Sequence, residues 1–179
     1  MSSYTQYFHE GLMELKGALV SHERWLFMGM QDIKLRYRRS IIGPWWVTIS
    51  TGALVTMLGF LWSHIFGADL QDFLPYFAVG WVVWGWMSGQ FIDAAGGFFQ
   101  FQGVIKQIKL PFLIYILRLN VRQLIILLHN SVIIVLVLLM IGQGFTLTSL
   151  VATLNLILIQ LNLTLLSVVI TIFRTRYQD

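Results

Sequence analysis

Few side chains of this 179-residue chain could carry acid–base or metal chemistry, and the sequence scatters them. Asp93 is the acid placed deepest in the apolar part of the sequence, and one carboxylate does not form an acid–base pair. We expect it to be a helix-end residue that faces water. The histidines are isolated, and none belongs to a His-Glu-x-x-His pattern: His9, His22, His64 and His129. Because cysteine is also absent, we predict no metal site, no catalytic residue and no enzyme activity.

Nucleotide and nucleic-acid binding have no support in the sequence either. No Gly-x-x-x-x-Gly-Lys-Ser/Thr loop is present to hold nucleotide phosphates, so we expect no cofactor in this chain. The net charge is only +4, and no long basic run is interleaved with polar residues. A nucleic-acid partner is therefore not expected. His129, with Asn130 and Ser131 beside it, favours hydrogen bonding between helices over proton transfer.

The composition instead indicates a membrane protein. Hydrophobic residues make up 57% of the chain, charged residues 11%, and the mean hydropathy is +0.74. Ordinary soluble domains carry about 25% charged residues. Residues 45–66 contain no Asp, Glu, Lys or Arg. As a helix they would be about 33 Å long, enough to cross the hydrocarbon core of a bilayer.

The residues before and at the start of this run predict its orientation. Arg36, Arg38 and Arg39 precede the run, and Trp45 and Trp46 open it. Basic residues are enriched on the cytoplasmic side of a membrane, and tryptophan is enriched at the membrane–water interface. Anionic headgroups of membrane lipids are the expected partners of the arginines. We therefore predict a cytoplasmic N-terminus and a first span that runs outward.

Three further apolar runs follow, and each is long enough to cross. The predicted spans are residues 44–66, 74–92, 112–141 and 147–173. Every predicted inner segment has basic residues and neither outer loop has any, so both ends are predicted to be cytoplasmic. The predicted fold is all-α and transmembrane, with residues 1–40 as a cytoplasmic N-terminus and residues 41–179 as the transmembrane domain.

An amphipathic helix is predicted just before the first span. Leu26, Met30, Ile33 and Tyr37 follow one another at spacings of four, three and four residues. These spacings place them on one helical face, and basic residues lie opposite. An apolar face next to a span suits the membrane interface, and packing on the protein's own soluble part is the alternative.

Residues 98–110 form a second amphipathic segment, too polar to cross the membrane. One helical face carries Phe98, Phe101, Val104, Ile105 and Ile108, and the opposite face carries Gln102, Lys106 and Lys109. Pro111 closes the segment. The lysines predict that this short helix lies on the cytoplasmic side, between the second and third spans.

Some polar and aromatic residues of the spans are candidates for a translocation path. Trp81 and Trp84 share a face, where flat rings could stack on sugars, although packing or lipid contact is the simpler explanation. Arg118 and Arg122 are four residues apart on one face and are expected to reach back to cytoplasmic headgroups. The fourth span offers polar groups that either hold helices together or line a path: Asn155, Gln160, Asn162, Thr164 and Ser167.

Three sequence blocks resemble the membrane permease subunit of type-2 ABC exporters, in particular those that export O-antigen and other lipid-linked polysaccharides. RYRRSIIGPWW at 36–46 is similar to the family's start of the first span. GVIKQIKLP at 103–111 is similar to its segment after the second span, and FRTRYQD at 173–179 to the segment after the fourth. The blocks occur in the family's order along nearly the whole chain.

The resemblance implies a coupling helix that docks on a separate ATP-binding ATPase subunit. The contact residues it implies are Phe101, Val104, Ile105, Lys106, Ile108, Lys109, Leu110 and Pro111. It also implies a second copy of the chain, a lipid-linked glycan as substrate, and a place in the bacterial inner membrane. The segment before the first span is implied to be an interface helix near the ATPase.

The chain departs from the family in its number of spans. Six are usual, whereas four are predicted here, and we expect a fragment that lacks two C-terminal spans. An ABC exporter of a different substrate fits the same blocks. A membrane-embedded transferase that acts on lipid-linked sugars is the alternative from another class, and a helical scaffold without transport is a third.

Overall fold

The computed structural model describes residues 2–38, 42–43, 45–96, 98, 103, 110–142, 144 and 147–177, with side chains from residue 6 onward. This part of the chain is helical and has no strand. Its helices are α1 (Ser2–Val20), α2 (His22–Arg36), α3 (Trp45–Phe66), α4 (Leu70–Gly96), α6 (Phe112–Ile141) and α7 (Leu147–Arg176). The all-helical prediction is therefore confirmed for the described residues.

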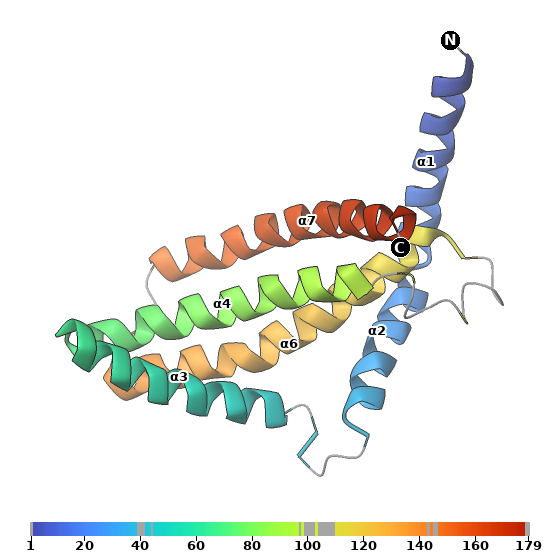
Figure 1. Cartoon of the computed structure of the whole chain (residues 1–179). Helices are drawn as coiled ribbons and strands as arrows, with labels where there is room; N and C mark the ends of the chain where they lie inside the picture. Colours follow the sequence, from blue (N-terminus) through green and yellow to red (C-terminus); the bar gives the residue numbers. More distant parts are fainter. Residues whose placement is uncertain are drawn as a thin grey trace.

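Four of the helices lie side by side as a bundle, and the first two lie at one end of it (Figure 1). α3 and α4 form an antiparallel pair joined by a turn at Gly67, whose φ of 62° suits glycine. α4 packs against α3, α6 and α7, and α2 packs against α6. α1 projects away from the bundle (Figure 1). The end that holds α2 also holds the last turns of α4 and α7 and the first turn of α6.

Among the described residues, three helices are long and apolar enough to cross a membrane: α3, α6 and α7. The chain therefore has the character of a membrane protein. The second predicted span, residues 74–92, lies within α4 and does not reach the same hydropathy. Tyrosine, three tryptophans and the amide of Gln90 lower its mean value. Four spans are thus not confirmed, although all four segments are helical.

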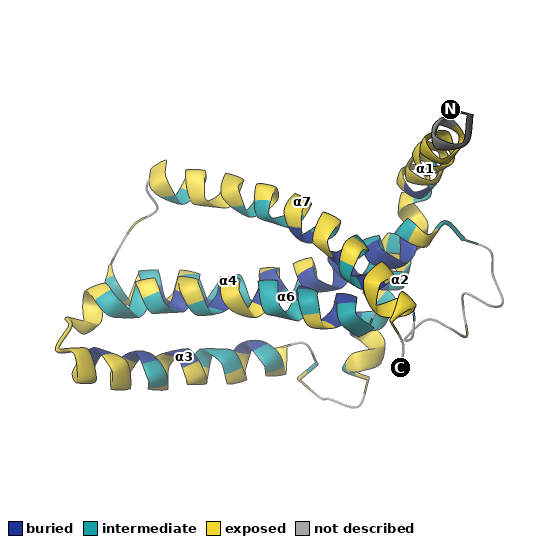
Figure 2. Cartoon of the chain, turned by 45° about the horizontal axis from the view of Figure 1, so that its top comes forward, coloured by how far each residue is buried: buried dark blue, intermediate teal, exposed yellow. Residues whose placement is uncertain are grey.

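Apolar side chains of the four bundle helices meet in one core. α3 supplies Val55, α4 supplies Trp86, α6 supplies Leu127, and α7 supplies Leu163. Figure 2 shows this buried band along the inner side of the helices and exposed residues along the outer side. Lipid tails are as apolar as these side chains, so close packing and hydrogen bonds, rather than exclusion of water, must hold membrane helices together.

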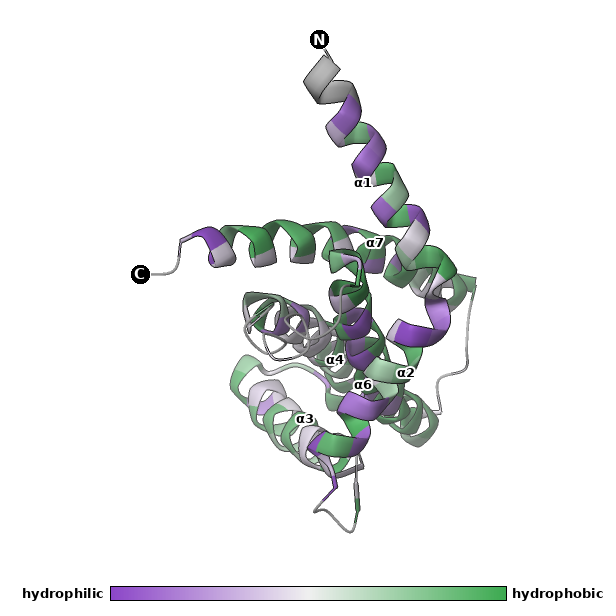
Figure 3. Cartoon of the chain, turned by 90° about the vertical axis from the view of Figure 1, so that its right-hand side faces the viewer, coloured by the Kyte–Doolittle hydropathy of each residue, from purple (hydrophilic) through white to green (hydrophobic). Residues whose placement is uncertain are grey.

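The predicted amphipathic segments have different outcomes. α2 is a helix, as expected, but it faces α6 with Gly29 and Ile33, and Met30 remains exposed. Most of residues 98–110 lies outside the described residues, and so do residues 39–41 beside the predicted domain boundary. Figure 3 shows hydrophilic and hydrophobic residues alternating along α1, whereas α7 is mostly green, that is, hydrophobic.

Candidate functional site

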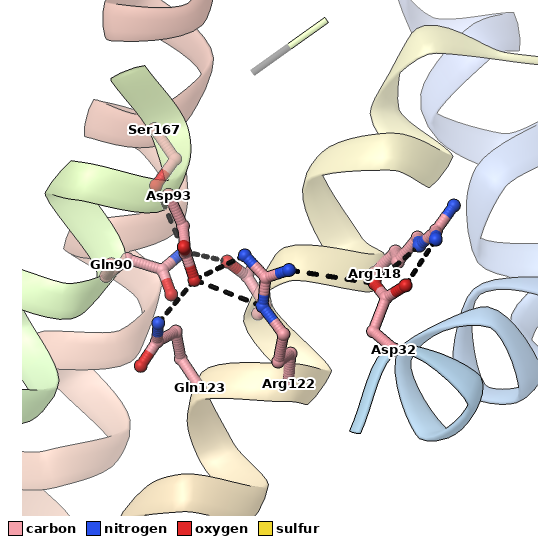
Figure 4. A network of polar contacts seen from close by, with 8 residues as sticks. Asp32, Gln90, Asp93, Arg118, Arg122, Gln123 and Ser167 are labelled. Carbon is pink, nitrogen blue, oxygen red and sulfur yellow. Dashed lines mark hydrogen bonds and ion pairs between the residues drawn. The ribbon is translucent and has the colours of Figure 1, made fainter. Parts of the chain in front are cut away.

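Four charged side chains meet inside the protein at the α2 end of the bundle (Figure 4). Arg118 donates from Nε to Asp32 Oδ2 at 2.6 Å and also pairs with Asp32 Oδ1 through its terminal nitrogen. Arg122 Nη2 lies 2.5 Å from Asp93 Oδ2, and its Nη1 lies 3.9 Å from Asp32 Oδ2. We call these four residues the ion cluster.

The ion cluster joins three helices and is electrically balanced. Asp32 comes from α2, Asp93 from α4, and the two arginines from successive turns of α6. The four side chains are only 7–14% exposed. Removing a charge from water is costly unless an opposite charge and hydrogen bonds compensate it. Two carboxylates beside two guanidinium groups meet this requirement, so removing one charge alone would leave its partner uncompensated.

Side-chain amides extend the ion cluster toward α7. Gln123 of α6 donates its amide hydrogen to Asp93 Oδ2. Gln90 of α4 donates both to Asn120 Oδ1 and to Ser167 Oγ, the latter at 3.0 Å. These residues are buried, where an amide without a partner would be unfavourable. Gln123 thus links α6 to α4 within the ion cluster, and Gln90 and Asn120 link α4 and α6 to α7 in a second group of hydrogen bonds.

Two further contacts complete the attachment of α7. Asn120 Nδ2 donates to Thr164 Oγ1 at 2.7 Å, and Thr171 Oγ1 donates to the carbonyl of Ala94 at 3.0 Å. Of the polar residues on the fourth predicted span, Thr164 and Ser167 thus hold helices together. Asn155 and Asn162 lie on the exposed surface instead.

Glycines let the helices that carry these groups approach closely. A Cβ atom at Gly29 of α2 would lie 2.7 Å from Val121 and 3.1 Å from the carbonyl oxygen of Arg118. A Cβ atom at Gly89 of α4 would lie 2.9 Å from Gln123 Oε1. Both distances are shorter than ordinary van der Waals contact. Small residues at these two crossings therefore allow Asp32 and Asp93 to reach α6.

The ion cluster has the chemistry of a structural joint. Its guanidinium groups are occupied by carboxylates, and its carboxylates accept from guanidinium and amide groups. Within the described ranges, no three residues of the types His, Cys, Asp and Glu are arranged to hold a metal ion. What the arrangement can do is hold α2, α4 and α6 together at this end of the bundle.

Comparison with models of protein families, with curated proteins and with solved structures finds no match to this chain. The geometry of the site must therefore be interpreted from its own residues.

The structure corrects two expectations about charged residues. Arg118 and Arg122 do not extend to the headgroups, because Asp32 and Asp93 bind them inside the protein. Asp93 does not face water, because it is buried against α6 and accepts hydrogen bonds from Arg122 and Gln123. An arginine in a predominantly apolar helix is stabilised more by a buried carboxylate than by reaching past neighbouring helices for solvent.

The two tryptophans predicted with these arginines on a translocation path lie elsewhere. Trp84 is 65% exposed, and Trp81 is half-buried. Both line an open apolar groove of about 540 Å³ on α4. The remaining lining residues are Pro75, Tyr76, Phe77, Val79 and Gly80. The structure thus separates the predicted path residues into a groove and the ion cluster.

The groove borders a row of aromatic rings. The ring centroids of Phe73 and Phe77 are 5.8 Å apart, and those of Phe77 and Trp81 are 5.6 Å apart. Phe66 of α3 continues the row at 6.3 Å from Phe73. Such offset and tilted arrangements are favourable for aromatic pairs. The row makes this side of α4 apolar.

The residues predicted to set the orientation are exposed where the structure describes them. Arg36 and Arg38 are exposed at the end of α2, and Arg39 lies outside the described residues. Trp45 and Trp46 are exposed in the first turn of α3, and the Trp45 ring meets His129 edge-on at 5.3 Å.

Most residues predicted to couple to an ATPase lie outside the described ranges: Phe101, Val104, Ile105, Lys106, Ile108 and Lys109. Leu110 and Pro111 are described and half-buried. Phe98, at the start of the segment, packs with Leu110 against Tyr115 and Leu119. The two ends of residues 98–110 therefore meet on the first turns of α6.

Four members of this site were not predictable as such from the sequence: Asp32, Gln90, Asn120 and Gln123. One signal was present, since arginines within an apolar run require buried acceptors and the neighbouring segments offer Asp93 and Asp32. Which acid each arginine takes depends on helix packing.

Proposed function

We propose that this chain is the permease subunit of an ABC exporter of lipid-linked polysaccharide. In this proposal two copies form the path across a bacterial inner membrane, and a separate ATPase subunit binds ATP and drives transport. The three sequence blocks at 36–46, 103–111 and 173–179 support the assignment. The observation that supports it most is the position of the ion cluster relative to residues 98–110.

The ion cluster brackets the segment proposed to dock on the ATPase. Asp93 lies three residues before Gly96, the end of α4, and Arg118 lies seven residues after Pro111. By helical rise Arg118 is about 10 Å beyond that proline. A push on the segment therefore acts directly on α4 and α6, and through Asp32 on α2. Stiff connections of this kind are what an ATPase needs to move helices in the membrane.

We propose four spans with both ends in the cytoplasm. α4 packs against α3, α6 and α7, so its polar residues can be covered by protein rather than by lipid. With α4 as a span, Arg36 and Arg38 lie on the same side of the membrane as Arg174 and Arg176, as the distribution of basic residues requires. α2 is then an interface helix whose exposed apolar residues meet the headgroup region.

The groove on α4 is the proposed contact for the transported glycan. Trp81 and Trp84 present apolar rings, and flat rings bind sugar faces without fixing a single bound state. Arg118 and Arg122 are assigned to the joint rather than to the path, because both are paired and nearly buried. A transferase would need acids free to act on substrate, and both acids of the cluster are engaged by arginine.

The deciding experiment is co-purification with the ABC ATPase encoded beside this chain. A complex with two copies of each subunit is expected after extraction in mild detergent. Ile105→Asp together with Ile108→Asp should abolish association and leave membrane insertion intact. Leu128→Asn, on the exposed surface of α6, serves as the matched control and should retain the complex. Failure of the native chain to bind the ATPase would overturn the proposal.

A further inference from the structure

A groove lies on the outer face of the last turns of α7. Its volume is about 360 Å³, and five residues line it: Val169, Ile172, Phe173, Arg176 and Tyr177. They follow one another at spacings of three, one, three and one residues, so they share one helical face. All five are exposed. The groove is therefore a surface feature of the end of α7 and does not belong to the core or to the ion cluster.

The bundle lies on the other side of α7. The helix packs into the bundle with the buried Leu163, Ser167 and Thr171. At 3.6 residues per turn, these three lie roughly opposite the groove. Figure 2 shows the last turns of α7 as largely exposed. Because α7 is long and apolar enough to cross a membrane, this face of the helix is turned toward lipid in a membrane.

One end of the groove is apolar and the other is cationic. Val169 and Arg176 are seven residues apart, which is about 10 Å along the helix axis. Within the described part of the chain, the Arg176 guanidinium makes no ion pair, and no acid lines the groove. Arg118 and Arg122, by contrast, are each bound by a carboxylate inside the protein. Arg176 is thus a cation available to an anion from outside the chain.

Aromatic residues indicate the depth at which this cation lies. The ring centroids of Phe173 and Tyr177 are 4.6 Å apart. Tyrosine is enriched at the membrane–water interface, and its hydroxyl group both donates and accepts hydrogen bonds. An arginine near the end of a membrane helix extends toward the headgroups in the same way. The apolar half of the groove therefore lies beside acyl chains, and Arg176 and Tyr177 lie at the depth of the headgroups.

We propose that this groove binds an anionic phospholipid of the surrounding membrane. One acyl chain packs on Val169, Ile172 and Phe173, and the phosphate accepts hydrogen bonds from the Arg176 guanidinium. A phosphate paired with arginine forms strong, charge-assisted hydrogen bonds. A zwitterionic phospholipid offers the same chains and phosphate, but its ammonium group cancels the negative charge that attracts a basic side chain. The inference goes beyond the proposed transport function, because the site needs neither an ATPase nor a glycan.

Native mass spectrometry of the full chain in mild detergent tests the site. Dioleoylphosphatidylglycerol and dioleoylphosphatidylcholine are added in turn, because their acyl chains are identical and only the first has a net charge. Phosphatidylglycerol should bind the native chain more tightly than phosphatidylcholine does. One basic side chain near a membrane surface corresponds to about fivefold in affinity for anionic lipid. Arg176→Gln should therefore weaken the binding of phosphatidylglycerol by about fivefold and leave that of phosphatidylcholine unchanged.

Arg174→Gln is the matched control for the charge. It removes the same charge from the same helical turn, but Arg174 lies on another face and does not line the groove. Phosphatidylglycerol should bind this variant as it binds the native chain. A second pair of variants tests the apolar half of the groove. Ile172→Ser should lower the bound fraction of both phospholipids, whereas Leu154→Ser, at a similarly exposed residue outside the groove, should not.

Equal or absent binding of the two phospholipids by the native chain would overturn the proposal, and so would equal losses in Arg174→Gln and Arg176→Gln. A polyprenyl diphosphate that displaces phosphatidylglycerol at equal concentration would also overturn it, because the groove would then be a substrate site. The same spectra report the number of chains. A dimer that dissociates in Arg176→Gln would assign the groove to a second copy and overturn the lipid site. ATPase binding is measured separately, so its failure would leave this result standing.

Discussion

Arg118 of α6 and Asp32 of α2 form a two-pronged ion pair across 86 residues of sequence. This pair attaches α2 to α6, the helix that follows the proposed docking segment. Arg122 lies one turn further along α6 and forms an ion pair with Asp93 on α4. α2 is thus fixed to the bundle by these charges as well as by the buried Ile33 of its apolar stripe.

Asp32→Asn should lower the free energy of unfolding by about 3–5 kcal/mol, because it leaves buried arginine charge uncompensated. The measurement is the thermal midpoint in detergent. The double variant Asp32→Asn with Arg118→Gln should be more stable than the sum of the single changes predicts, since it removes both charges of the pair. Strict additivity of the two changes would show that the side chains do not interact.

Gly29→Ala should separate α2 from α6. The new Cβ would lie 2.7 Å from Val121, and overpacking of this kind costs about 1–3 kcal/mol. Gly11→Ala is the control, because nothing lies within 4 Å of a Cβ there. Alanine favours the helix over glycine, so the control should be neutral or slightly stabilising. Limited proteolysis near residue 40 reports the release of α2, and equal protection in both variants would contradict the close approach.

Glu14→Ala should loosen α1 from the first turn of α6. Glu14 Oε1 accepts from the backbone N–H of Phe112 at 2.9 Å, and a carboxylate at a helix N-terminus is stabilising. The loss is expected to be about 0.5–1 kcal/mol. Glu10→Ala removes an acid that bonds only Gln6 on its own helix and should have less effect. Hydrogen exchange of the α6 amides distinguishes the two variants.

Gly80→Leu should block the groove on α4 without disturbing the fold. Nothing lies within 4 Å of a Cβ at this position, yet Gly80 lines the groove beside Trp81 and Trp84. Stability should be unchanged, and export of the lipid-linked glycan should fall. Gly85→Leu is the matched control, since it is equally open and lies outside the groove. Equal export by both variants would remove the groove from the proposed path.

Features that depend on neighbouring residues along the chain were predictable from the sequence. The 22-residue helix α3 coincides with a run that contains no charged residue, and α6 and α7 likewise coincide with long apolar runs. Hydropathy alone does not decide whether α4 crosses the membrane, because its tryptophans and Gln90 lower its mean hydropathy. Whether protein or lipid covers α4 depends on the helices packed around it.

The sequence by itself determined that the chain is helical, that α3, α6 and α7 suit a membrane, and where the basic residues flank them. These properties depend on neighbouring residues along one helix. Only the tertiary structure decided that Arg118 pairs with Asp32, that Arg122 pairs with Asp93, and that Ser167 accepts a hydrogen bond from Gln90. A buried charged group pairs with the opposite charge that helix packing brings close to it. That packing depends on small residues such as Gly29, and the periodicity of the sequence does not reveal their role.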